Sequence, residues 1–258
     1  MGQGSARLYR RAVCTAALVA VHALACAAPA RADPLPPAAA QPTAFSTLRA
    51  GASLAPWTFV TLAIGKHRTR YDLVDDGGKV VLHAIADNAA SALADPVRID
   101  LHATPMVAWR WKIAGLIDDA DSRQASREDA PARLVLEFDG DKAKLPLVER
   151  GIYGLARHVA GRDLPYATLM YIWSNRESVG TVIANPRTRR IEMVVASSGA
   201  DGVGAWQSLL RNVHDDFVRA FGEEPGPLTA VGVLTDSDNT DGHAEAWYGD
   251  IRFERAAH

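Results

Sequence analysis

Apolar and polar residues alternate along much of the chain with a period of two. In MVAWRWKIAG, residues 106–115, the large apolar side chains fall on one face and Arg110 and Lys112 on the other. ARLVLEFDG, residues 132–140, repeats the pattern, with Arg133 opposite its leucines. Side chains of a β-strand point alternately to its two faces, so both segments are predicted to be half-buried strands with their charges away from the core.

Similar strand signals recur along the chain, separated by turn residues such as Asp76-Gly77-Gly78. These strands are predicted at residues 56–62, 70–74, 79–87, 96–101, 168–174, 190–196, 228–235 and 243–253. Many short strands joined by turns are typical of a β-sandwich or barrel. We therefore predict a mainly β protein, an antiparallel β-sandwich with two accessory α-helices.

The two helices are predicted where the apolar spacing changes to three and four residues. Residues 204–222 carry one apolar stripe and end at Gly222. Residues 145–161 place Pro146 in the first turn and line up a second stripe. The basic face of this second helix is interpreted as solvated, and not as membrane-binding, because the chain is acidic overall.

The N-terminal segment has the layout of a cleavable secretory signal. Arginines precede an Ala/Val/Leu run, and the small-x-small triplet Ala30-Arg31-Ala32 follows it. We expect cleavage before Asp33, which gives a signal at 1–32, a Pro/Ala-rich spacer at 33–44 and one domain at 45–258. The predicted location is therefore periplasmic or secreted. A twin-arginine signal and a lipoprotein anchored at Cys26 are the alternatives.

Removal of this segment changes the composition. It holds both cysteines, so the mature chain has no internal disulfide. It also holds four arginines and no acids, so Lys+Arg falls from 28 to 24 against 30 Asp+Glu, a net charge of −6. That balance argues against a nucleic-acid partner. Its apolar run is shorter than the roughly 20 residues that a membrane span needs, so stable membrane insertion is not expected.

Familiar catalytic signatures are missing from the sequence. There is no G-x-S-x-G, H-E-x-x-H, paired C-x-x-C or P-loop. The glycine-rich stretch at 199–204 has the wrong spacing for a phosphate loop, and we interpret it as a turn. No catalytic residue and no cofactor is assigned.

Several phrases resemble a secreted bacterial family, domain of unknown function 3047. They lie at residues 109–112, 127–140, 171–181, 211–225 and 235–253, and the resemblance runs from about Phe45 to Phe253. The closing Tyr-Gly-Asp-Ile-x-Phe strand also resembles the last strand of galactose-binding-like jelly rolls, which implies a jelly-roll sandwich and glycan binding. Those domains often hold a structural calcium ion near an Asp-Asp-Ile triplet, where this chain has Gly249-Asp250-Ile251.

TDSDNTDGHAEAWYGDIRF, residues 235–253, is the densest polar stretch. It is not an EF-hand, because the twelfth position from Asp236 is Trp247 and not a bidentate Glu. A structural calcium loop, a polar hairpin turn and a ligand-binding rim are the three alternatives. Asp and Asn side chains beside an indole suit sugar hydroxyls and the apolar face of a pyranose.

Strand parity adds further candidates to this rim. Tyr171, Trp173 and Asn175 share one face of their strand, and Arg133 is predicted either to pair with Asp129 or to receive a ligand carboxylate. The candidate ligand-binding residues are Arg133, Tyr171, Trp173, Asn175, Asp236, Asp238 and Asn239.

Three functions are compatible with these patterns. The first is an exported, non-catalytic binding domain for a glycan or another polar envelope molecule. The second is an envelope carbohydrate-active enzyme, in which two carboxylates such as Glu137 and Asp236 flank the cleaved bond. The third is a protein-interaction module of an envelope complex.

Overall fold

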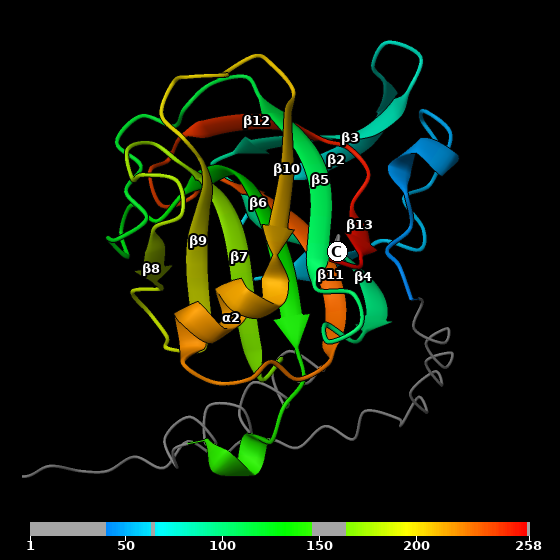
Figure 1. Ribbon diagram of the computed structural model, residues 1–258. Coiled ribbons are helices and arrows are strands. Elements are labelled where there is room, and N and C mark those ends of the chain that lie inside the picture. The colour runs from blue at the N-terminus through cyan, green and yellow to red at the C-terminus, as the bar shows by residue number, and fades with distance from the viewer. Residues whose placement is uncertain (1–39, 63–64, 146–163, 257–258) are drawn as a thin grey trace, which may run out of the picture. The chain divides into compact units, whose positions relative to one another are not determined.

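The computed structural model describes residues 40–62, 65–145 and 164–256 (Figure 1). The predicted signal at 1–32 and all but the first residue of the predicted 145–161 helix lie outside these ranges. No helix among the described residues is long and apolar enough to cross a membrane.

The described residues form two β-sheets. The seven-stranded sheet has the order β1 (Thr58–Thr61), β4 (Ala90–Ile99), β11 (Leu228–Asp236), β6 (Ala130–Phe138), β7 (Ala167–Ser174), β9 (Ile191–Ser198) and β8 (Val182–Ala184). The six-stranded sheet has the path β10 (Gln207–Asn212), β5 (Met106–Ile113), β12 (His243–Tyr248), β3 (Val80–Asp87) and β2 (Arg70–Asp75), with β13 (Arg252–Glu254) paired to β5. The described residues also contain two 3₁₀ turns (Phe45–Thr47 and Lys142–Lys144) and helix α2 (Val213–Phe221). The mainly β sandwich predicted from the sequence is confirmed.

One strand pair departs from the antiparallel rule. All paired strands of both sheets are antiparallel except β7 and β9, which are parallel. The chain leaves β7, reverses in β8 at the sheet edge, and reverses again into β9, which pairs with both of them. Two reversals return the chain to the direction of β7.

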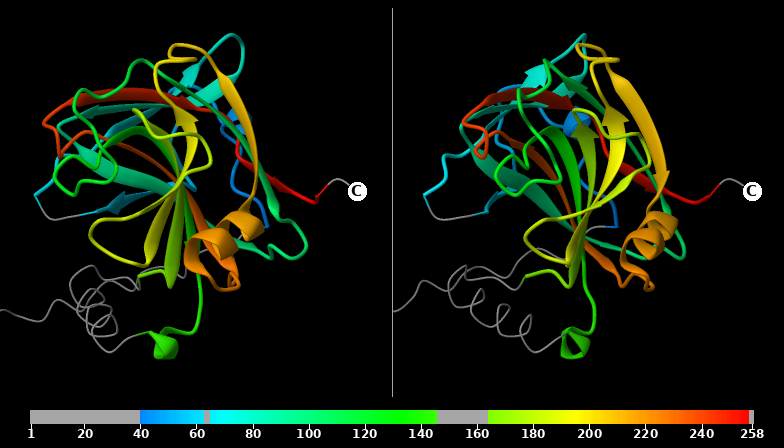
Figure 2. Two further views of the ribbon diagram at one scale, coloured as in Figure 1. Left: turned by 60° about the vertical axis from the view of Figure 1, so that its left-hand side comes forward. Right: turned by 90° about the vertical axis from the view of Figure 1, so that its left-hand side faces the viewer.

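The core lies between the two sheets, which the two views of Figure 2 show as separate layers. Trp109 and Trp111 project inward from β5 of the six-stranded sheet and meet the rings of Tyr171 and Trp173 from β7 of the other. The ring centroids are 5.1 Å apart for Trp109 and Tyr171 and 6.3 Å apart for Trp111 and Trp173. Large aromatic side chains thus fill the centre of the sandwich.

The helix predicted at 204–222 is wrong in its first half. Residues 207–212 form β10, which pairs residue by residue with β5. Helix α2 begins after Asn212, whose side chain accepts a hydrogen bond from the Asp215 amide, and ends at Gly222 in the left-handed conformation. It lies at one end of the sandwich (Figure 1), where Phe217 packs against Phe138.

Trp206 was expected to lie on that helix and instead precedes β10. Its ring lies 4.3 Å from the Arg110 guanidinium carbon and 5.2 Å from the Lys112 ammonium nitrogen. Its indole nitrogen donates to Asp76 at 2.6 Å. Trp206 is therefore a partly exposed side chain on the six-stranded sheet, held by cations and not by the apolar core.

Candidate functional site

The candidate site is built around Arg133, on the outer face of the seven-stranded sheet. Arg133 lies on β6 between inward-facing residues, so its side chain projects away from the core, as its strand parity predicts. Only 1% of that side chain is exposed. Asp236, at the end of the neighbouring strand β11, approaches it where the pairing of the two strands is irregular.

Every N–H group of the Arg133 guanidinium has an acceptor. Nε and Nη2 donate to the two carboxylate oxygens of Asp236 at 2.8 and 3.0 Å. Nη1 donates to Glu128 Oε1 at 3.2 Å and faces the Met193 sulfur at 3.4 Å, and Nη2 also donates to the Glu128 carbonyl at 2.8 Å. The guanidinium is therefore a structural centre and has no donor left for a ligand.

Asp129 has a different task from the one expected of it. It does not pair directly with Arg133 but accepts hydrogen bonds from four groups of the loop after β11. The Asn239 amide nitrogen and side-chain nitrogen donate at 3.1 and 2.9 Å, and the Thr240 amide and hydroxyl at 2.8 and 2.7 Å. Asp129 thus fixes the polar loop against the start of β6.

Burial shapes the electrostatics of Asp236. Desolvation raises the pKa of its carboxyl to about 7, the Arg133 guanidinium opposes this rise, and the charges of Asp129 and Glu128 add to it. The same carboxylates hold the pKa of Arg133 above its ordinary value, so the guanidinium stays charged. Three acidic side chains thus surround one buried cation.

A pocket of about 400 Å³ opens over this cluster. It is called the charged pocket below. Its lining residues are Leu62, Lys66, Ala90, Glu128, Arg133, Met170, Asn185, Arg187, Thr188, Ile191, Leu234, Asp236, Asp238 and Asn239.

Two further ion pairs border the charged pocket, and in each of them the cation is the exposed partner. Lys66 pairs with Asp238, with 39% and 6% of their side chains exposed. Arg187 pairs with Glu128, with 49% and 7% exposed. The surface that a ligand meets first is therefore positive, although the numbers of acids and bases are similar.

Four of the seven candidate residues meet in the charged pocket, namely Arg133, Asp236, Asp238 and Asn239. The other three are elsewhere. Tyr171 and Trp173 are fully buried on the opposite, inner face of the same sheet, because Tyr171 is in register with the core residue Leu134.

Each of these three side chains is held by a structural partner. The Tyr171 hydroxyl donates to Asp216 at 2.8 Å, and the Trp173 indole to the Gly199 carbonyl at 3.0 Å. The Asn175 side chain donates to the Ile117 carbonyl at 2.6 Å. Accordingly, no aromatic side chain of the described residues lines the charged pocket.

Sequence reasoning missed Lys66, Glu128, Asn185 and Arg187. Glu128 stands next to Asp129 in the sequence, and that adjacency was an available signal. Asn185 and Arg187 belong to the turn between β8 and β9, and Lys66 to the segment between β1 and β2. Turn residues carry no periodic pattern, so nothing in the sequence indicates their arrival at the pocket.

The acidic cluster does not fit a calcium ion. Asp129, Asp236 and Asp238 bring one oxygen each within 4.8 Å of one another. However, Asp236 is bound by Arg133, Asp238 by Lys66 and Asp129 by the loop. Calcium requires six to eight oxygen ligands, and here cations already pair with two of the three carboxylates while loop donors occupy the third.

The Gly249-Asp250-Ile251 triplet, the other candidate calcium position, also has its polar groups occupied by protein partners. Asp250 accepts from the Ser46 amide and hydroxyl at 2.9 and 2.6 Å and lies 3.6 Å from Lys79. A side chain in place of Gly249 would overlap that of Arg110. The position of the first acid of the triplet is thus closed by an arginine.

We therefore expect chelation to leave the protein unchanged. EDTA should not shift the melting temperature, because no carboxylate of the cluster awaits a metal. Thermal denaturation with and without EDTA, and again with added calcium, measures this. A decrease in melting temperature with EDTA that disappears in Asp238→Ala would show that a metal is bound after all.

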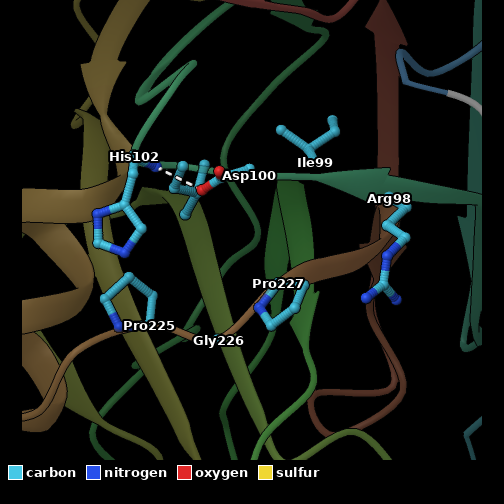
Figure 3. Close-up of a pocket in the computed structure, with 8 residues that line it drawn as sticks. Arg98, Ile99, Asp100, His102, Pro225, Gly226 and Pro227 are labelled. Atoms are coloured by element: carbon cyan, nitrogen blue, oxygen red, sulfur yellow. Dashed lines mark hydrogen bonds between the residues drawn. The ribbon is translucent and has the colours of Figure 1, made fainter.

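A separate pocket of about 510 Å³ lies between the end of β4 and the loop after α2 (Figure 3). Its acid, Asp100, accepts the His102 amide at 2.9 Å, and the Asp100 carbonyl accepts the Thr104 amide at 3.0 Å. Pro225 and Pro227 form the opposite side. The Asp100 carboxylate thus serves a turn, and this pocket gathers fewer polar groups than the charged pocket.

Fold and site together define a β-sandwich domain with a charged pocket on the outer face of its larger sheet. The chain belongs to the family described as protein of unknown function DUF3047, whose model matches residues 55–252. Among solved structures it is similar to the family 30 carbohydrate-binding module of a cellulosomal cellulase of Clostridium thermocellum. The identity is 12%, the match covers 86% of this chain and 96% of that chain, and the TM-score is 0.37. A search of curated proteins finds no match.

Proposed function

We propose that this chain is an exported, non-catalytic binding domain that holds a glycan or another polar envelope molecule in the charged pocket. The observation that carries this proposal is that the charged groups of the pocket differ in burial. Buried Arg133 and its acids form a rigid floor, while Lys66, Arg187 and Asn185 are partly exposed above it. Preorganised polar groups around a concave site are what selective binding of a polar ligand requires.

The buried acids are poorly placed for catalysis. Both oxygens of Asp236 accept from Arg133, and one also accepts from the Ala130 amide at 3.3 Å. A general acid or base must reach the proton that it transfers, whereas Asp236 is held below the pocket surface. Its raised pKa therefore reflects burial in a structural pair.

The carboxylate pair suggested for an enzyme is too widely separated. Asp236 is in register with Ala130, seven residues from Glu137 along β6. At about 3.3 Å per residue this puts their Cα atoms roughly 23 Å apart. Glycosidases hold their two carboxylates about 5 to 9.5 Å apart, so the geometry favours binding over hydrolysis.

A glycan array probed with the purified chain tests the proposal. We expect Lys66→Ala to weaken binding of any retained glycan at least about tenfold, because a charged hydrogen bond contributes about 1.5–3 kcal/mol. Its melting temperature should fall only slightly, because Lys66 is partly exposed and its removal lets water reach Asp238.

Arg123→Ala is the matched control. Arg123 is also an exposed cation in an ion pair, with Glu177 at 2.8 Å, but it does not line the charged pocket. It should bind as the wild type does. Equal binding by all three proteins would place the ligand outside the charged pocket and refute the proposal.

A further inference from the structure

A second hollow of about 430 Å³ continues from the charged pocket along the same sheet face. It is called the apolar trough below. The two share the side chains of Leu62, Met170, Ile191 and Leu234, so they are neighbouring parts of one surface. The remaining lining residues of the trough are Val60, Thr61, Ala92, Ala94, Val135, Glu137, Leu164, Pro165, Thr168, Ala230 and Gly232.

The trough is hollow because small residues meet in register on its floor. Ala94 of β4 faces Gly232 of β11, and Gly232 faces Val135 of β6. One step along, Ala92 faces Leu234. Large apolar side chains would fill this space, whereas alanine and glycine leave it open beside a mostly apolar wall.

Water in the trough would find few hydrogen-bond partners, so an apolar group gains free energy by replacing it. At the other end, Lys66 and Arg187 present positive charge to solvent, because the acids that pair with them are buried. One continuous surface therefore offers an apolar bed and a cationic end.

We propose that the ligand is an anionic amphiphile. Its negatively charged head lies at Lys66 and Arg187, and its unbranched alkyl tail lies in the apolar trough. The placement of the head rests on the function proposed above, and the tail extends that proposal. The site takes a single molecule because the trough and the charged pocket share four residues.

Isothermal titration with butyl, octyl and dodecyl phosphate, each below its micelle concentration, tests the inference. Each added methylene should tighten binding roughly three- to fourfold until the trough is filled, from about 0.8 kcal/mol per buried methylene. Octyl glucoside, which has the same tail and an uncharged head, should bind more weakly than octyl phosphate.

Two substitutions separate head from tail. Ala94→Trp fills the trough and should abolish the gain in affinity from butyl to dodecyl phosphate. Ala92→Leu repeats this test with a smaller side chain, and circular dichroism verifies that both variants fold. Lys66→Ala should weaken all three phosphates by one common factor.

The outcomes distinguish the two proposals. Affinity that depends on Lys66 but not on chain length would refute the amphiphile and leave the polar-ligand function standing. A gain with chain length that survives both Ala94→Trp and Ala92→Leu would also refute a tail in the trough. Equal binding of octyl glucoside and octyl phosphate would refute the anionic head. If no phosphate and no glycan binds in a Lys66-dependent manner, both proposals are wrong.

Discussion

Replacing Arg133 with alanine should destabilise the protein by about 3–5 kcal/mol. The substitution leaves Asp236 buried with neither of its two guanidinium donors and takes from Glu128 a cationic partner. Urea denaturation followed by tryptophan fluorescence measures the free energy of unfolding. The double variant Arg133→Met, Asp236→Leu should be less destabilised than Arg133→Ala, because it removes both charges of the main pair.

The loss should also depend on pH. Without Arg133 the pKa of Asp236 rises above its value of about 7, so the folded variant holds a proton that the unfolded chain has released at neutral pH. Stability of the variant is then retained at low pH and lost as pH rises through that raised pKa. The loss relative to the wild type should be larger at pH 8 than at pH 5.

Arg187→Ala provides the comparison within the same cluster. Arg187 is half-exposed and pairs with the same Glu128, so its loss should cost less than about 1 kcal/mol. If Arg133→Ala cost no more than Arg187→Ala, the guanidinium would not be the structural centre inferred from its contacts.

The single substitution Trp173→Ala in the wild type should lower the free energy of unfolding by about 3–5 kcal/mol. Trp173 is fully buried between the sheets beside Trp111, so its removal leaves a cavity and a Gly199 carbonyl without its donor. Chemical denaturation of the variant gives the value.

Trp206→Ala is the matched control, because Trp206 lies at the surface. It should lower the free energy of unfolding by only about 1–2 kcal/mol, from a lost cation–π contact and one hydrogen bond to Asp76. A reversed order of the two losses would contradict the placement of Trp173 in the core and of Trp206 on the outer sheet face.

The contrast between Arg133 and Trp173 shows how far the sequence can be interpreted. On β6 the charge of Arg133 identifies the outer face, because a charged residue is expected away from the core. On β7 almost every residue is buried, on both faces of the sheet. Alternation there indicates that Tyr171 and Trp173 share a face, but no charged residue on the strand marks which face points to the core.

The helix prediction for residues 207–212 is wrong for a different reason. Leu209 and Leu210 fit an apolar stripe of a helix, and Leu209 alone fits the inner face of a strand. The segment forms a strand and not a helix because β5 provides a backbone partner for each of its residues. That is a tertiary effect, and local spacing does not contain it.

Distance along the chain decides which pocket residues could be grouped from the sequence. Asp236, Asp238 and Asn239 are close in sequence and follow a recognisable strand, so their clustering could be predicted. Lys66 and Arg187 reach the same place only through the strand order of the folded sheet.

The wide spacing of the pocket residues along the chain bears on when the site comes into being. Its members extend from Leu62 to Asn239 of 258 residues, and Arg133 waits for a counter-ion 103 positions later. A polypeptide emerging from the ribosome therefore has no complete pocket until β11 and the loop that follows it have been synthesised. Under the function proposed above, a chain that ends before Asn239 lacks part of the pocket and should not bind the ligand.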